Sequence, residues 1–331
     1  MTRTRVACIG SGFIAGRHLA ALGFFDDVEV VAVADTVPDR AEAAAAAFGA
    51  RAYGDGLDLL REQELDAVWI CVPPFAHGAL EELAVARGVP LFVEKPLACD
   101  LPTAERIAAL VRSTGTLAAV GYHWRYLALV EEVRELLRDR PPAVVTGYWL
   151  DRTPAAPWWV DRASSGGQMV EQATHLLDLA RLLVGEVSAV RAVEVPAGPD
   201  AGPATMVPMA ASATLSFTAG AIGTVTSARF LHARHRVALH LLGEGCAIEL
   251  SERSLTDHEL LVSTTEGTRV RASDEDPIRR EDRAFLDAVT GRGHDVRAPY
   301  AEALRSHRLA TTAERSAQEG GTLLSIGDGD A

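Results

Sequence analysis

A glutamate, a histidine and an aspartate recur at helical spacing near the middle of the chain. Glu171, His175 and Asp178 stand at positions i, i+4 and i+7, which places all three on one face of a helix. The stretch 168–184 has the composition of such a helix, with leucines on its other faces. We therefore expect a polar stripe that faces a cleft or solvent.

This stripe has the side chains that proton transfer requires. Removal of hydride from a carbinol carbon needs a base that takes the hydroxyl proton, and histidine suits that task near neutral pH. Glu171 could fix the tautomer of His175 and stabilise its protonated form. The alternative is an ordinary solvated Glu–His pair on a helix surface.

A glycine-rich turn near the N-terminus has the spacing of a dinucleotide site. Gly10, Gly12 and Ala15 form a G-x-G-x-x-A pattern between an apolar strand-like run and a helical stretch. Gly10 allows a tight turn, Gly12 lets the backbone approach a pyrophosphate, and the helix start at Phe13 and Ile14 presents free N–H groups to the anion. The turn by itself predicts only that some dinucleotide binds.

Asp35 adds information about which dinucleotide this is. It ends the second predicted strand, where a carboxylate accepts hydrogen bonds from an adenosine ribose and repels a 2′-phosphate. This favours NAD(H) over NADP(H). Asp35 could also cap the helix that begins at Pro38, and Arg40 could serve a 2′-phosphate.

The elements around these residues alternate between short β-rich runs and helical stretches. Such alternation predicts βαβ units and a parallel sheet, so we assign residues 1–121 to a Rossmann domain. The expected strands are 6–9, 28–34, 67–72, 91–93 and 117–120, and the helical stretches include 38–48, 76–87 and 103–113.

The pattern changes after residue 121. Strand candidates separated by glycine-containing turns predict a largely antiparallel open sheet, in an α+β domain over 122–331. The closing helices could pack on either domain, and the stretch 196–208, rich in Ala, Gly and Pro, is expected to be a surface loop. The predictions are a helix at 127–138, strands at 144–150, 211–217, 222–228, 236–242 and 260–264, and helices at 279–289 and 300–318.

Composition limits the class of protein. The 331 residues suit two domains, and no segment reaches the about 18 apolar residues of a membrane span. Without a secretory signal at the N-terminus, a cytoplasmic, soluble protein is expected. The net charge of −13 argues against nucleic acid as a partner. Cys8, Cys71, Cys99 and Cys246 have no metal-type spacing, so we expect reduced thiols and no metal.

Further motifs complete a set that runs through nearly the whole chain. After the glycine-rich turn come Val72-Pro73-Pro74 with His77, Glu94-Lys95-Pro96, Gly121-Tyr122-His123-Trp124-Arg125-Tyr126, and the run from Gly166-Gly167-Gln168 to His175-Leu176-Leu177-Asp178. In this order the motifs resemble those of the glucose-fructose oxidoreductase / inositol dehydrogenase / MocA (Gfo/Idh/MocA) family.

The resemblance implies a Rossmann domain followed by a domain whose open sheet often forms the interface of a homodimer or homotetramer. Members oxidise or reduce a carbinol carbon of a sugar or cyclitol, using the Lys of Glu-Lys-Pro with an Asp and a His one helical turn apart. These map onto Lys95, Glu171 and His175, and Glu171 departs from the usual Asp by one methylene. Lys95, at a strand's carboxyl end, could hold the substrate oxygen and stabilise alkoxide charge.

The resemblance also suggests further binding residues. Those expected at the cofactor are Val72, Pro73, Pro74, His77, Glu94 and Arg125, while His123, Trp158 and Trp159 are expected at the substrate. Other roles remain open: His77 could begin a helix, both tryptophans could be core, and Arg125 could bind substrate or have a surface role.

These observations predict an NAD(H)-dependent dehydrogenase or reductase that acts on a sugar, sugar derivative or cyclitol. One alternative is a redox-neutral lyase or glycosidase in which NAD is reduced and reoxidised in each cycle. Another is a non-catalytic, NAD-binding regulator on the same fold. The presence of Lys95, Glu171 and His175 counts against the regulator.

Overall fold

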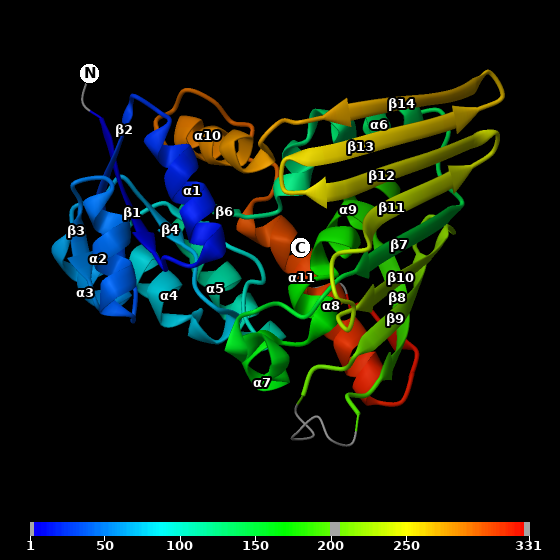
Figure 1. The fold of residues 1–331 in the computed structure, drawn as a ribbon, viewed down its shortest axis with the longest axis horizontal. Coiled ribbons are helices and arrows are strands. Elements are labelled where there is room, and N and C mark those ends of the chain that lie inside the picture. Colours follow the sequence, from blue (N-terminus) through cyan, green and yellow to red (C-terminus); the bar gives the residue numbers. More distant parts are fainter. Residues whose placement is uncertain (1–2, 199–205, 328–331) are drawn as a thin grey trace. The chain divides into compact units, whose positions relative to one another are not determined.

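The computed structural model describes residues 3–198 and 206–327, so part of the expected loop at 196–208 lies outside the described residues. The chain forms two compact units (Figure 1). Unit 1 comprises Met1–Tyr126 and Pro277–Leu304, and unit 2 comprises Leu127–Asp276 and Arg305–Ala331.

Unit 1 contains a six-stranded parallel sheet in the order β3-β2-β1-β4-β5-β6. The order reverses between β1 and β4, which is where open parallel sheets bind ligands beyond the carboxyl ends of their strands. The predicted Rossmann fold is thereby confirmed. The strands are β1 (Thr4–Ile9), β2 (Val28–Ala34), β3 (Arg51–Tyr53), β4 (Ala67–Ile70), β5 (Leu91–Val93) and β6 (Ala118–Val120).

Helices cover both faces of this sheet, and two separate apolar clusters form its core. A helix from late in the sequence, α10, packs against α1 in this unit. The helices are α1 (Phe13–Gly23), α2 (Pro38–Ala46), α3 (Gly56–Glu62), α4 (Ala79–Ala86), α5 (Leu101–Thr114) and α10 (Pro277–Val289), with short 3-10 turns η1 (Pro74–Ala76) and η2 (His123–Tyr126).

Unit 2 contains a nine-stranded sheet in the order β14-β13-β12-β11-β7-β10-β9-β8-β15. Among the described strands of this sheet only the β7–β10 pair is parallel, so the prediction of a large, mostly antiparallel sheet is confirmed. The strands are β7 (Val144–Leu150), β8 (Val187–Val195), β9 (Ala210–Phe217), β10 (Ile222–Ala228), β11 (Arg236–Gly243), β12 (Cys246–Ser254), β13 (Asp257–Thr264), β14 (Gly267–Ser273) and β15 (Leu324–Ser325).

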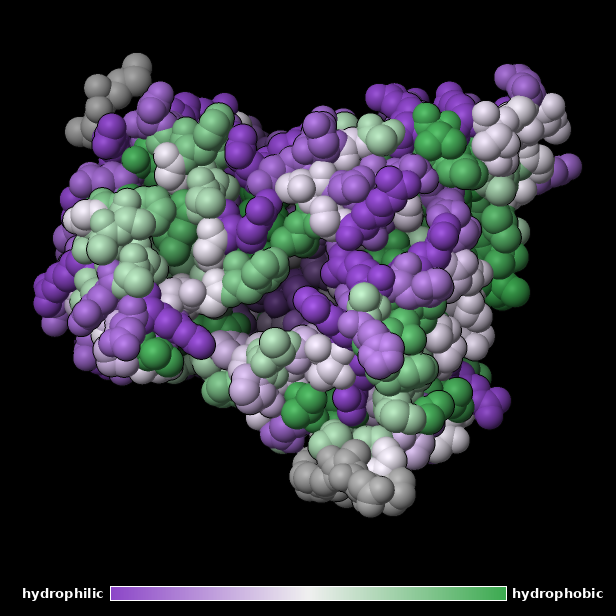
Figure 2. Space-filling model, in the orientation of Figure 1, coloured by the Kyte–Doolittle hydropathy of each residue, from purple (hydrophilic) through white to green (hydrophobic). Residues whose placement is uncertain are grey.

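One face of this sheet packs against α9 and the other face is open (Figure 1). At Gly147 in β7 an added Cβ would lie 3.4 Å from a methyl of Leu176 in α9, so the helix lies close to the strand. Hydrophobic residues also gather along the sheet side of unit 2 in Figure 2. The helices of unit 2 are α6 (Ala128–Leu137), the turn η3 (Pro157–Val160), α7 (Arg162–Ser165), α8 (Gln168–Glu171), α9 (Thr174–Val184) and the second part of α11 (Tyr300–Gln318).

The single helix predicted over 168–184 is wrong. The chain forms α8 and α9 with a break at Gln172 and Ala173, because the amides of both residues bond to the carbonyl of Gln168 at 3.1 Å. The second of these bonds spans five residues and closes the first helix. Glu171 and His175 therefore lie on different helices.

No helix among the described residues is long and apolar enough to cross a bilayer.

Candidate functional site

The glycine-rich turn joins β1 to α1 with the local geometry that its sequence predicts. Gly10 has a φ of +95°, and an added Cβ would lie 2.2 Å from the carbonyl oxygen of Cys71, so only glycine fits there. A Cβ at Gly12 would meet nothing within 4 Å. No side chain caps the first turn of α1, where Phe13 is 81% exposed and Ile14 is half-buried. The backbone N–H groups there can meet an anion such as a pyrophosphate.

Asp35 lies directly after β2 and connects the turn to the next helix. Its Oδ2 accepts hydrogen bonds from the amide and the hydroxyl of Ser11, at 2.9 and 2.7 Å, and its Oδ1 accepts one from the Val37 amide at 2.9 Å. Burial raises the pKa of this carboxyl, but the hydrogen bonds and the charge of Arg40 outweigh it and lower the pKa below its ordinary value. Asp35 is thus an oriented carboxylate beside the turn.

The Val72-Pro73-Pro74 segment follows β4 at the same edge of the sheet, with Pro74 starting η1. Nδ1 of His77 lies 2.5 Å from Oε1 of Glu81, whose Oε2 accepts the Gly78 amide at 2.6 Å. His77 therefore stands at the start of α4. Its Nε2 is buried and has no hydrogen-bond partner among the described residues, which suits contact with a bound polar group.

Glu94 and Lys95 follow β5, again at the carboxyl edge of the sheet. Glu94 is buried, and its Oε2 accepts the amide of Lys95 at 3.0 Å, while Lys95 itself is half-buried. At Gly121 an added Cβ would lie 2.3 Å from Oε1 of Glu94, so the neighbouring motif must have glycine there. The backbone of Lys95 is thus fixed by its own neighbour in the sequence.

A buried network that the sequence did not reveal supports Glu94. His18 of α1 lies between two carboxylates, with Nε2 3.0 Å from Oε1 of Glu94 and Nδ1 2.8 Å from Oδ1 of Asp282. The indole of Trp69 donates to the same Asp282 oxygen at 2.8 Å. Burial lowers the pKa of His18, but the two carboxylates outweigh it and raise the pKa well above its ordinary value. The raised pKa favours the protonated form of His18 between the two carboxylates.

Two further predicted residues lie in η2, and both are buried. Arg125 donates to the carbonyl of Arg297 at 2.8 Å and to Oε1 of Glu302 at 3.2 Å, all within unit 1. His123 lies two positions earlier and is 4% exposed. The expected role of Arg125 at the cofactor stays a prediction.

In unit 2, Glu171 ends α8 and is half-buried. Its Oε2 accepts a hydrogen bond of 2.5 Å from the indole nitrogen of Trp159, which is 1% exposed. The preceding Trp158 is more exposed. Trp159 is therefore a hydrogen-bond donor to the predicted catalytic carboxylate.

His175 lies in the first turn of α9. Its ring stacks on Trp149 of β7, with centroids 5.7 Å apart and an interplanar angle of 19°. Asp178 is buried and accepts a hydrogen bond of 2.6 Å from Ser306 of α11. The prediction that Asp178 belongs to a stripe facing a cleft or solvent is wrong, because a packed helix covers it.

Comparison with known proteins identifies the class. Residues 4–122 match the model of an oxidoreductase family with an NAD-binding Rossmann fold, and residues 140–249 match the model of the GFO/IDH/MocA C-terminal domain. The chain belongs to the Gfo/Idh/MocA family of oxidoreductases, as its motifs predicted.

Curated relatives of known name match part of the chain. D-apiose dehydrogenase of Paraburkholderia graminis is 32% identical over 57% of this chain and 52% of its own length. Inositol 2-dehydrogenase of Rhizobium meliloti is 32% identical over 55% of each chain. The chain thus spans about half the length of these relatives.

Solved structures match the fold over nearly the whole chain. Levoglucosan dehydrogenase in complex with NADH and L-sorbose has a TM-score of 0.86, at 20% identity, over 99% of this chain and 100% of that chain. An oxidoreductase from Agrobacterium radiobacter in complex with NAD+, L-tartaric acid and magnesium has a TM-score of 0.85, at 21% identity, over 98% and 99%. The two-unit fold is therefore shared with these proteins.

Proposed function

We propose that this protein is an NAD(H)-dependent oxidoreductase that transfers hydride between nicotinamide and a carbinol or ketone carbon of a sugar, sugar derivative or cyclitol. One observation carries the proposal. The uncapped turn at Gly10, the carboxylate of Asp35 and the side chain of Lys95 follow β1, β2 and β5 of one parallel sheet, so all three stand at its carboxyl edge. The names of the curated relatives support this substrate class.

The cofactor that fits this edge is NAD(H). A pyrophosphate would be held by the N–H groups of the turn and of the start of α1. The carboxylate of Asp35 would accept hydrogen bonds from the adenosine ribose and would repel a 2′-phosphate. Pro74, His77 and Glu94, which follow β4 and β5, would lie toward the nicotinamide side.

We assign the chemistry to three side chains. When bound, the nicotinamide cofactor would supply or take up the hydride. Lys95 of unit 1 would hold the substrate oxygen and stabilise negative charge on it. His175 of unit 2 would take the hydroxyl proton as general base, and Glu171 would orient the substrate or the imidazole. The Trp159 indole donates to Oε2 of Glu171 and so contributes to the orientation of this carboxylate.

The test is a turnover screen that follows nicotinamide absorbance. Purified protein is incubated with NAD(H) and NADP(H) in both directions against sugars, aminosugars and cyclitols. The proposal predicts NAD(H)-linked turnover of at least one of them. Product formed without a net change in NADH would instead indicate the redox-neutral alternative, and binding of NADH without any product would indicate the regulator.

We also propose that the open face of the nine-stranded sheet joins copies of the chain. Large apolar side chains are exposed on its strands, among them Val193, Ile222 and Val270, at 53%, 59% and 55%. Exposed apolar side chains on an uncovered sheet face are a common feature of interfaces between subunits. Light scattering of the purified protein should report a dimer or tetramer, and Ile222→Glu should reduce its mass, whereas a monomer would contradict the proposal.

A further inference from the structure

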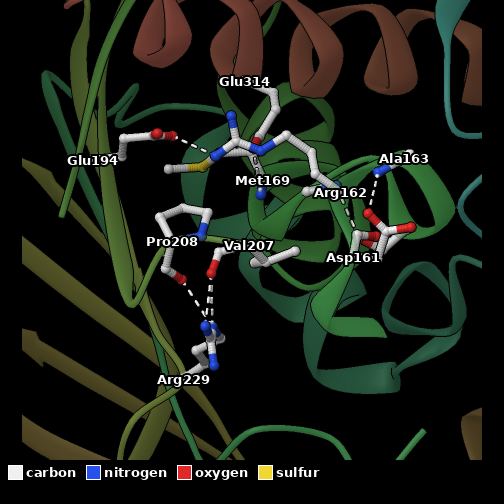
Figure 3. A network of polar contacts seen from close by, with 11 residues as sticks. Asp161, Arg162, Ala163, Met169, Glu194, Val207, Pro208, Arg229 and Glu314 are labelled. Atoms are coloured by element: carbon white, nitrogen blue, oxygen red, sulfur yellow. Dashed lines mark hydrogen bonds and ion pairs between the residues drawn. The ribbon is translucent and has the colours of Figure 1, made fainter. Parts of the chain in front are cut away.

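The carboxyl group of Glu314 lies close to both Arg162 and Met169 (Figure 3). Glu314 lies in the part of α11 that belongs to unit 2, and the residue is 4% exposed. Its Oε2 accepts a hydrogen bond of 3.2 Å from the amide of Met169, and its Oε1 lies 3.3 Å from Nε of Arg162. One buried carboxyl thus contacts two segments of the chain.

The first segment carries the backbone of Glu171. Gly167 has a φ of +102°, and an added Cβ would lie 2.1 Å from Oε1 of Glu314, so the carboxyl packs directly on a bare glycine. The carbonyl of Gly167 accepts the amide of Glu171 at 3.0 Å. Gly167 therefore contacts both the carboxyl group of Glu314 and the backbone of Glu171.

The second segment carries the residue that binds the side chain of Glu171. Trp159 donates its indole hydrogen to Glu171, and Arg162 follows three positions later in the chain. Arg162 donates to Glu194 of β8 at 2.8 Å and pairs with Glu314 through its Nε (Figure 3). The ion pair thereby attaches the segment of Trp159 and Arg162 to Glu314, the same residue that contacts the segment of Gly167 and Met169.

We propose that Glu314 is a positioning residue, whose ionised carboxylate fixes both segments and so sets the orientation of the Glu171 side chain. This inference rests on the proposed function, in which Glu171 acts on the substrate or on His175. The contacts of Glu314 are with Arg162 and Met169, so we expect it to affect the reaction only through the orientation of Glu171.

The electrostatic surroundings of Glu314 place its ionisation in the neutral range. Burial and the nearby charge of Glu194 raise its pKa to about 7, against the opposing effects of Arg162 and of the Met169 amide. The charged groups that face it are Arg162 from α7 and Glu194 from β8, while α8 contributes the Met169 amide. The ion pair with Arg162 should therefore form as pH rises through about 7.

A kinetic comparison with Glu314→Gln tests this role, because glutamine keeps the shape and has no charge at any pH. The ratio of wild-type to variant kcat should be near one at acid pH and rise to about fivefold in mild alkali, since misorientation of a catalytic group lowers turnover. The KM for NAD should stay unchanged. The matched control is Glu319→Gln, an exposed position just beyond α11, where the ratio should stay near one. A Glu314→Gln ratio that does not vary with pH would overturn the inference.

Hydrogen–deuterium exchange supplies a readout that does not need a substrate. In mild alkali the amides of residues 167–172 should exchange faster in Glu314→Gln than in the wild type, and Glu319→Gln should leave them unchanged. Equal exchange in all three proteins would overturn the inference, as would faster exchange with unaltered kcat. If the wild type turns over no substrate, the proposed function fails, and the exchange result still decides whether Glu314 holds this segment.

Discussion

The imidazole of His18 bridges Glu94 and Asp282, with its two nitrogens 3.0 and 2.8 Å from a carboxylate oxygen of each. His18 lies on the helix that follows the glycine-rich turn, and Glu94 directly precedes Lys95. The bridge therefore connects the turn proposed to bind the pyrophosphate with the lysine proposed to act on the substrate. His18 and Asp282, which form one half of this bridge, are 264 residues apart in the sequence.

Replacement of His18 by leucine should lower the free energy of unfolding by about 3 kcal/mol, because it leaves two buried carboxylates without their cation. Urea unfolding at neutral pH measures this. The matched control is His294→Leu at an exposed position, which should change the free energy by less than about 0.5 kcal/mol. Equal stability of the two variants would contradict the bridge.

The stabilisation by His18 should also depend on pH. Its folded-state pKa is raised above the unfolded value of about 6.5, so its contribution is complete below that pH and is lost as pH rises through the folded-state pKa. The stability difference between the wild type and His18→Leu should therefore shrink in alkali. A difference that grows there would contradict a charged His18.

Alanine at the two turn glycines should have opposite consequences. Gly10→Ala should cost at least about 2 kcal/mol of stability, since its positive φ and the Cys71 carbonyl both exclude a side chain. Gly12→Ala meets no neighbour, so the protein should stay folded, but the methyl group would face the pyrophosphate. We expect the Kd for NADH to rise about tenfold there. Thermal unfolding and calorimetric titration would measure the two effects, and tight NADH binding by Gly12→Ala would contradict the assigned site.

Asp35→Ser should weaken the binding of NAD selectively. The substitution removes the carboxylate that would bind the ribose and repel a 2′-phosphate, so the preference for NAD over NADP should fall about tenfold or more. The kcat/KM for each cofactor measures this ratio. An unchanged ratio would leave Asp35 only its hydrogen bonds to Ser11 and Val37.

Trp159→Phe should reduce kcat about tenfold while the Kd for NADH stays constant. Phenylalanine keeps most of the buried ring but removes the donor to Glu171. Steady-state kinetics and NADH titration of the same preparation separate the two effects. Unaltered kcat would mean that the indole hydrogen bond has no part in orienting Glu171.

The sequence predicted those parts of the fold that depend on local pattern. The glycine-rich turn and the strands β1, β2 and β10 follow from hydrophobic runs and punctuating glycines. The short elements β3 and α3 were not predicted. Three residues of β3 are too few to show a periodicity, and α3 depends on an N-terminal cap, in which Asp55 accepts the Leu57 amide at 2.6 Å.

The residues of the candidate site stay a prediction, and the contacts that support them could not be predicted from the sequence. Motif spacing identified Lys95, Glu171 and His175, whereas the break after Glu171 depends on backbone hydrogen bonds that composition does not reveal. The contacts of His18 and Glu314 join residues far apart in the chain, and local sequence patterns do not predict such pairs. The helical pattern was real, but local backbone hydrogen bonds at Gln172 and Ala173 interrupt the helix.

The most direct test of the proposed function compares the wild type with Lys95→Ala in two assays on one preparation: NADH titration and turnover of the substrate that the screen identifies. The account predicts that NADH binding changes less than about threefold while turnover falls by about a thousandfold or more, because Lys95 would stabilise charge only as the reaction proceeds. Full turnover by Lys95→Ala would contradict it.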